Sequence, residues 1–246
     1  MQRLLLTLRY DGTAYHGWQV QPNGVTVQES LQDAIQAVTG VRSGVIGCSR
    51  TDAGVHADMF CCTFDTDSPL RGDKLAAALN FHLPRDIAVY AAREVAADFH
   101  PRYQAAGKRY EYRIWNGKQR HPLYDRYALH RNRPLDAELM NRAAADFVGT
   151  HDFAAFCGAG SAVEDTVRTV RRCTVERRDD LVVFTVEGDG FLYNMVRIMV
   201  GTLLEIADGR LPADGIPAIL SSLDRNMAGP TAPAKGLCLR QVFYTE

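Results

Sequence analysis

The chain has 246 residues, 46% of them hydrophobic and 23% charged, with a formal net charge of −1. These proportions are typical of a soluble globular protein with one large domain or two of ordinary size. The longest apolar run near the N-terminus, Leu4-Leu5-Leu6, is too short for a signal peptide and no other run could span a bilayer, so we expect a cytoplasmic protein without membrane contact.

The first half of the chain is predicted to alternate strands and helices. MQRLLLTLRYDG alternates in hydrophobicity and ends in Asp-Gly, which indicates a strand that runs into a turn. Thr26 and Glu29 have the spacing of a capping box, and the apolar stripe behind them ends at Gly40, which predicts a helix. The later elements of this half are strands in GVIGCS and ADMFCCTFDT, a helix near 74–81 and a strand near 87–94.

The second half has a similar proportion of strands and helices. Its predicted elements are strand 108–115, helix 136–148, a hairpin of 168–177 and 181–188, helix 190–209, helix 216–223 and strand 236–245. A hairpin pairs its two strands antiparallel. We therefore expect an α+β fold of two similar α/β halves, residues 1–104 and 105–246, packed side by side.

The stretch SRTDAGVHA at 49–57 lies between two predicted strands of the first half. Asp52 is expected to project from the rim of a sheet while the small residues after it turn the chain. If this stretch is extended, Arg50 lies on the same face as Asp52. An aspartate that merely closes a turn is one interpretation, because aspartate is common in turns. The other is that the loop presents a carboxylate to a reacting group.

The apolar stretch of the predicted helix 190–209 contains a single charged residue, Arg197. The other members of its stripe are Tyr193, Asn194 and Gly201. A buried guanidinium needs an anionic partner, from the protein or from a ligand. Asp52 is a candidate, because an adjacent arginine opposes the rise in pKa that burial causes in a carboxyl group. We predict that the two residues lie within ion-pair distance, and a purely structural ion pair is the alternative.

The segment 98–133 has nine lysines and arginines against three acids, a local charge of +6 that leaves −7 for the rest of the chain. Seven aromatic residues and three histidines are interleaved with this charge. Such a mixture suits a surface that neutralises phosphates and stacks bases. As a strand, 108–115 places Lys108, Tyr110 and Tyr112 on one face. The alternative is a solvated charged face whose tyrosines are ordinary core residues.

The six cysteines include no CxxC pair, and the seven histidines show no HExxH spacing. In a cytoplasmic protein, scattered cysteines are expected to be reduced thiols. The sequence therefore predicts no metal site and no cofactor, although ligands from distant positions would escape a search by spacing.

Six stretches, in order along the chain, resemble the bacterial tRNA pseudouridine synthase A (TruA) family. They are YDGTAYHGWQVQP at 10–22, RTDAGVHA at 50–57, KRYEYRI at 108–114, GTHDFAAF at 149–156, DGFLYNMVRIMVG at 189–201 and APAKGLCLRQVFY at 232–244. The resemblance implies a cofactor-free isomerase that converts uridine to pseudouridine in the anticodon stem-loop of tRNA, at nucleotides 38–40. It also implies a homodimer, with each active cleft between two α/β halves that share a central, mainly antiparallel sheet.

The resemblance also assigns roles to individual residues. It makes Asp52 the catalytic aspartate, Tyr110 the tyrosine that stacks on the target base and Arg197 the partner of the aspartate. Arg50 is expected to help hold or replace the flipped nucleotide, and Leu237 is expected to form a wall of the pocket.

One position departs from the family pattern, because Ser49 stands where the family usually has glycine. If that glycine needed a positive φ, the loop of this chain must strain or turn differently. Two other functions remain open. A non-catalytic RNA-binding protein would use segment 98–133 as its surface. A metal-dependent hydrolase of nucleic acid would need clustered acids or histidines.

Overall fold

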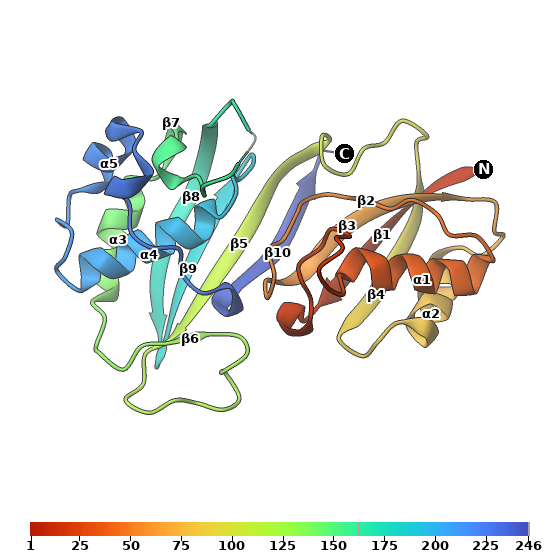
Figure 1. Ribbon diagram of the computed structural model, residues 1–246, viewed down its shortest axis with the longest axis horizontal. Helices are drawn as coiled ribbons and strands as arrows, with labels where there is room; N and C mark the ends of the chain where they lie inside the picture. Colours follow the sequence, from red (N-terminus) through yellow and green to blue (C-terminus); the bar gives the residue numbers. More distant parts are fainter. Residues whose placement is uncertain (162, 246) are drawn as a thin grey trace. The chain divides into compact units, whose positions relative to one another are not determined.

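The computed structural model describes residues 1–161 and 163–245, and the chain divides into two compact units (Figure 1). Unit 1 comprises Met1–Ala106 and the chain from Cys238 onward, and unit 2 comprises Gly107–Leu237. The chain passes from unit 1 to unit 2 after Ala106, two residues beyond the boundary that we place at 104/105 from the sequence. Most of the last strand, which the sequence-based division assigns to the second half, groups with unit 1, where it pairs with a strand.

Unit 1 is built on a sheet with the strand order β4-β1-β3-β10, and the short strand β2 also pairs with β3. The pairs are antiparallel except for β10 with β3. The strands are β1 (Gln2–Tyr10), β2 (Ile46–Gly47), β3 (His56–Thr66), β4 (Ile87–Val95) and β10 (Leu237–Tyr244). The helices are α1 (Val27–Thr39), α2 (Gly72–His82) and the short 3-10 helix η1 (Gly12–Ala14). Helix α2 packs against α1 and β4 (Figure 1).

Helix α1 begins and ends where the sequence predicts. The Thr26 hydroxyl accepts a hydrogen bond from the Glu29 N–H at 3.3 Å, as expected of a capping box. Gly40 ends the helix with φ +77°, a conformation that glycine adopts without strain. The face toward the core includes Leu31 and Ile35, both fully buried. These local signals specify the helix almost completely.

Unit 2 is built on a sheet with the order β5-β9-β8-β7, in which each pair is antiparallel, and β6 runs parallel to β5. The strands are β5 (Ala105–Trp115), β6 (Leu129–His130), β7 (Gly149–Asp152), β8 (Val167–Arg178) and β9 (Leu181–Gly188). The α-helices are α3 (Ala137–Ala145), α4 (Met195–Ala207) and α5 (Ile216–Ser222). The 3-10 helices are η2 (Ala154–Phe156), η3 (Arg225–Met227) and η4 (Ala234–Gly236). The expected hairpin is confirmed as β8–β9.

The buried helix of unit 2 starts later than predicted. We expected it to cover 190–209, with Tyr193 and Asn194 on the stripe of Arg197, but α4 begins at Met195. Asn194 has φ +59°, which is left-handed and cannot belong to a right-handed helix. The stripe prediction is therefore wrong for Tyr193 and Asn194, which lie in the turn before the helix. The expected burial of the helix is confirmed, because ten of its thirteen residues are buried.

The expected fold class is confirmed: the protein is α+β, and its strands pair mainly antiparallel. None of the helices in the described part of the chain combines the length and the apolar character needed to cross a membrane.

Candidate active site

Asp52 lies in unit 1, in the loop between β2 and β3. Its backbone is held from both sides, because Thr51 O accepts a hydrogen bond from Trp18 N at 3.0 Å and Asp52 O accepts one from Val55 N at 3.1 Å. Gly54 has φ +78° and completes this tight turn without strain. Thr51 is buried, whereas Asp52 is only half-buried. The loop thus fixes the main chain of Asp52 while the residue as a whole stays partly exposed.

Two glycines let the segment after β1 approach this loop. A Cβ atom on Gly12 would lie 2.0 Å from Val55 O, and one on Gly17 would lie 2.4 Å from Thr51 O. Real Cβ atoms essentially never come this close to a carbonyl oxygen. Any larger residue at either position must displace the loop. The turn around Asp52 therefore depends on main-chain packing that only glycine permits.

Side chains at the end of β1 reinforce the same loop. Tyr10 OH and Thr51 Oγ1 share a buried hydrogen bond of 2.8 Å. On the other side of the loop, His56 Nδ1 accepts a hydrogen bond from Gly12 N at 3.0 Å. We did not single out Tyr10, Gly12 or His56 from the sequence. The available signals were two stretches that resemble the family, YDGTAYHGWQVQP at 10–22 with Tyr10 and Gly12, and RTDAGVHA at 50–57 with His56.

Arg50 and Ser49 precede this clamped turn. The side chain of Arg50 is exposed, so it is available to a ligand from solvent. The positive φ angles of non-glycine residues in the described chain occur at Asp179, Asn194 and Leu223, and Ser49 is not among them. The serine therefore fits its position without the left-handed strain that a glycine-requiring site would impose.

Tyr110 lies in unit 2, in the middle of β5. Burial alternates along this strand, and Lys108, Tyr110 and Tyr112 are all buried, which confirms that they share a face. The Tyr110 ring meets the Phe191 ring edge-on, with centroids 5.2 Å apart and planes at 84°. Edge-to-face pairs of this kind are favourable and orient both rings. Tyr110 is thus a fixed ring with only 6% of its surface exposed.

Arg197 lies in the first turns of α4 and is held by unit 2 itself. Its Nε donates to Ala232 O at 2.7 Å and its Nη1 donates to Asn194 Oδ1 at 2.8 Å. In return, Ala232 N donates to Arg197 O at 3.1 Å. Burial raises the pKa of the Tyr112 phenol, and the Arg197 guanidinium opposes that rise. The predicted contact between Arg197 and Asp52, a residue of unit 1, stays a prediction.

A segment at 229–237, here called the strap, follows η3, packs against α4 and leads into β10. Gly229 N donates to Thr202 Oγ1 of α4 at 2.9 Å, and the Tyr112 hydroxyl donates to Pro233 O of the strap at 2.7 Å. A Cβ on Gly201 would lie 1.7 Å from the backbone of the strap. Leu237 is the last residue of the strap and is buried. The strap thereby fixes both Arg197, through Ala232, and the main chain leading to Leu237.

Comparison with known proteins identifies the family of this chain. The tRNA pseudouridine synthase family matches residues 7–104 and 143–245. The chain belongs to this family. It is similar to proteins called tRNA pseudouridine synthase A from Acetivibrio thermocellus (49% identical over 244 residues), Moorella thermoacetica (48% over 246) and Thermoanaerobacter sp. strain X514 (47% over 244). Each match covers 99% of this chain and 100% of the relative.

Family membership makes this protein an isomerase that acts on the uridines of tRNA. Asp52, Arg197 and Leu237 lie inside the segments that match the family, whereas Tyr110 lies between them. The stretch around Tyr110 is nevertheless covered by the matches to the relatives, which extend over nearly the whole chain.

Part of the positive charge of the enzyme's basic segment 98–133 is engaged in ion pairs. Three of its arginines form ion pairs with acids. These pairs are Arg109 with Glu187 at 2.8 Å, Arg113 with Glu111 at 3.5 Å, and Arg131 with Asp208 at 2.5 Å. Two of the three acids lie outside the segment, so the local charge of +6 did not include them. The exposed cations are Arg102, Lys118, Arg120, Arg126 and Arg133.

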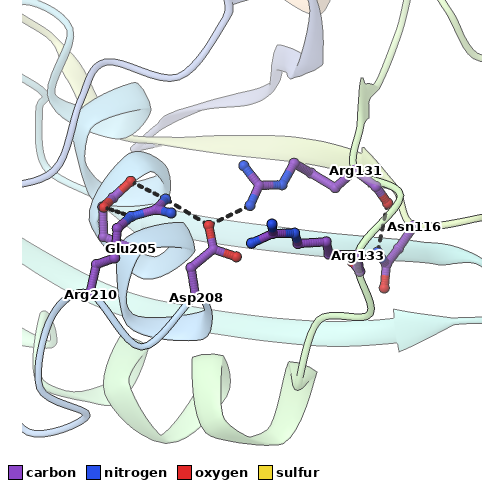
Figure 2. Close-up of polar contacts among 6 residues, drawn as sticks. All are labelled: Asn116, Arg131, Arg133, Glu205, Asp208 and Arg210. Carbon is purple, nitrogen blue, oxygen red and sulfur yellow. Dashed lines mark hydrogen bonds and ion pairs between the residues drawn. The ribbon is translucent and has the colours of Figure 1, made fainter.

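Arg131 belongs to a network at the end of α4 (Figure 2). Asp208 accepts hydrogen bonds from both Arg131 and Arg210, and Arg210 also binds Glu205. The bond from Arg131 is the main cause that holds the pKa of the Asp208 carboxyl below its ordinary value. Asn116 donates to the backbone carbonyl of Arg131 at 2.8 Å, which ties the first residue after β5 to the first residue after β6. This arginine therefore has a structural role.

Among the residues that the structure describes, no group of three or more histidines, cysteines, aspartates or glutamates is placed to hold a metal ion.

Proposed function

We propose that this enzyme converts uridine to pseudouridine in the anticodon stem-loop of tRNA, at nucleotides 38–40, with Asp52 as the catalytic carboxylate. The observation that carries the proposal is the loop of Asp52. Its main chain is fixed by Trp18 and Val55, yet Asp52 as a whole is only half-buried. The bond from Val55 is the ordinary hydrogen bond of a turn, and the bond from Trp18 additionally ties this turn to a distant segment of the chain. Membership of a family that isomerises tRNA uridines gives such a carboxylate a use.

The chemistry needs one ionised carboxylate. The bond between N1 of uracil and C1′ of the ribose breaks, the base rotates while it stays bound, and C5 bonds to C1′. C5 then loses its proton and N1 carries one, so the product is an isomer of the substrate. Asp52 either attacks the ribose as a nucleophile or takes the 2′ hydrogen as a base, and both routes start from the carboxylate anion. Ordinary glycoside hydrolysis differs, because it commonly uses two carboxylates and a water.

The remaining roles follow from the same proposal. Tyr110 stacks on the extruded base, which returns about 1–3 kcal/mol of the few kcal/mol that unstacking costs. Arg197 partners Asp52 and keeps it ionised in a water-poor site. Arg50, exposed in solvent, helps hold or replace the flipped nucleotide, and Leu237 forms an apolar wall for the base. The fixed ring of Tyr110 and the strap that holds Arg197 support these assignments, since catalytic groups need a supporting shell.

The proposal also includes the setting of the reaction, a cytoplasmic homodimer that needs no cofactor. Activity that survives EDTA, and a molar mass twice that of the chain in light scattering, are the expected results.

The decisive experiment compares Asp52→Asn with Asp58→Asn. Both changes remove one negative charge near the start of β3, but Asp58 is a surface residue that pairs with Arg9 and Arg240. An unmodified anticodon arm labelled with tritium at uracil C5 releases tritium when C5 bonds to C1′. We expect Asp52→Asn to abolish this release while RNA binding survives, and Asp58→Asn to retain it.

Two outcomes would contradict the proposal. Turnover in Asp52→Asn would remove the assigned role of that carboxylate. Binding without any tritium release in the unaltered protein would favour the alternative of a non-catalytic RNA-binding protein that uses segment 98–133. Arms with cytidine at 38, 39 and 40 in turn locate the modified nucleotide, and chromatography before mass spectrometry separates the product, because uridine and pseudouridine have the same mass.

A further inference from the structure

The residue before Asp52 is held more tightly than a turn requires. Thr51 Oγ1 shares a 2.8 Å hydrogen bond with Tyr10 OH, and both residues are buried. Thr51 O accepts the Trp18 N–H at 3.0 Å and faces the bare Cα of Gly17. Both the side chain and the main chain of Thr51 are therefore tied to the end of β1 and the segment that follows it.

The hydroxyl of Tyr10 is not needed to keep its ring in the core. The ring packs against Phe60 with centroids 5.7 Å apart and against Trp18 at 6.5 Å, and the Trp18 and Phe60 rings stack at 4.0 Å. A phenylalanine at position 10 would keep these contacts. A buried pair of hydroxyls that bond each other adds little net stability, since apolar groups of the same shape can be nearly as stable. The pair needs another explanation.

We infer that Tyr10 and Thr51 are positioning residues for pseudouridine formation, acting through the direction in which Asp52 projects. The inference rests on the proposed role of Asp52. Threonine is stiff about χ1, so a hydrogen bond that fixes its hydroxyl also restrains the backbone from which Asp52 continues. Catalytic groups must be held within about 0.5 Å of the productive geometry. A displacement of about 1 Å can lower the rate about a hundredfold.

The test uses substitutions that delete one hydroxyl and keep the shape. Tyr10→Phe and Thr51→Val each remove one partner, and the double variant removes both. In single-turnover assays with a labelled anticodon arm, we expect each single variant to lose about tenfold in rate with unchanged affinity for RNA. The double variant should lose no more than either single one, because the two hydroxyls act through one bond. Thr51→Ser, which keeps the hydroxyl and removes only the methyl group, should keep most of the rate.

Tyr244→Phe is the matched control. The Tyr244 hydroxyl donates to Pro101 O at 2.8 Å within the same unit, and Tyr244 is the last residue of β10. Tyr244→Phe removes a tyrosine hydrogen bond of the same length as the one that Tyr10→Phe removes. Thermal stability should therefore fall about as much as in Tyr10→Phe, while the rate stays unchanged. A merely structural role for Tyr10 predicts equal rates in Tyr10→Phe and Tyr244→Phe. If Tyr10→Phe does not fold, Thr51→Val, which is isosteric but lacks the hydroxyl, and Thr51→Ser, which keeps it, answer the same question.

The outcomes separate this inference from the proposed function. Asp52→Asn is measured beside the other variants, and its turnover would overturn the proposed function. If Asp52→Asn is inactive while Tyr10→Phe and Thr51→Val keep rates within twofold of the unaltered enzyme, only the positioning role is overturned. Losses that multiply to about a hundredfold in the double variant would also overturn it, because the hydroxyls would then act independently.

Discussion

Replacing Gly17 by alanine gives the sharpest test of how the loop of Asp52 is supported. The new Cβ atom would lie 2.4 Å from Thr51 O, whereas ordinary van der Waals contact begins at 3.4 Å. The contact therefore needs about 1 Å of movement by main chain on one side or the other. The substitution also places alanine at φ +84°, a left-handed conformation. That strain costs about 1–2 kcal/mol for a residue with a side chain.

The two effects are separable with Gly40→Ala as a control. Gly40 has φ +77°, nearly the same conformation, but a Cβ there would meet nothing within 4 Å. Both variants should lose about 1–2 kcal/mol of unfolding free energy through backbone strain. Only Gly17→Ala should also lose about a hundredfold in single-turnover rate, because only this variant displaces the residue next to Asp52.

Urea denaturation and release of tritium from a C5-labelled anticodon arm measure the two quantities. RNA affinity should stay within a few-fold in both variants, since neither residue is expected to contact the substrate. A rate in Gly17→Ala within twofold of that in Gly40→Ala would refute the reasoning. It would mean that the loop absorbs the displacement without moving the carboxylate.

Two other predictions concern charge. Lys118 is exposed, so Lys118→Gln should weaken tRNA binding and reduce the slope of log affinity against log salt by about 1. Arg109 is paired with Glu187, so Arg109→Gln should leave that slope nearly unchanged. Equal slopes in the two variants would contradict this prediction. The pKa of Asp208 is lower in the folded protein than the ordinary carboxyl value of 3.8, so its ion pair with Arg131 stabilises the protein fully above pH 3.8. This stabilisation is lost as the pH falls from 3.8 through the lower pKa of the folded state. Asp208→Asn should therefore cost about 1–2 kcal/mol at pH 7, and the difference in urea denaturation should shrink below about pH 4. A difference that is independent of pH would show that packing, not charge, causes it.

Most of the fold follows from signals that are local in the sequence. Helix α1 is an example, because its cap, its stripe and its final glycine all lie within fifteen residues. The strands β6 and β7 were missed, since they have two and four residues and are defined by their partners in β5 and β8. The late start of α4 was missed for a different reason: hydrophobic periodicity continues through Asn194, whose left-handed backbone the pattern does not reveal.

The site shows the same division between local and distant information. The motif around Asp52 stands out in the sequence, and so does Arg197 as a lone charge in an apolar stretch. The supports of both residues come from far along the chain. Tyr10 bonds Thr51 across 41 positions, and Ala232 receives the hydrogen bond of Arg197 from 35 positions away. Glu187 and Asp208, which pair with Arg109 and Arg131, lie far from segment 98–133 in the sequence, so a local charge count does not reveal these ion pairs.

The main chain beside Asp52 and the main chain beside Arg197 are held in the same way in the two units. A glycine without room for a Cβ lets one stretch of main chain rest on another: Gly17 on the carbonyl of Thr51, and Gly201 on that of Pro230. Hydrogen bonds between main-chain groups then join the two stretches beside each functional residue. Main chain held in this way has fewer rotatable bonds to fix than a contact between long side chains, so little entropy is lost to keep it in place. An enzyme that must hold a base while its glycosidic bond is broken and remade gains from such rigidity, because each functional group then stays where the next step needs it.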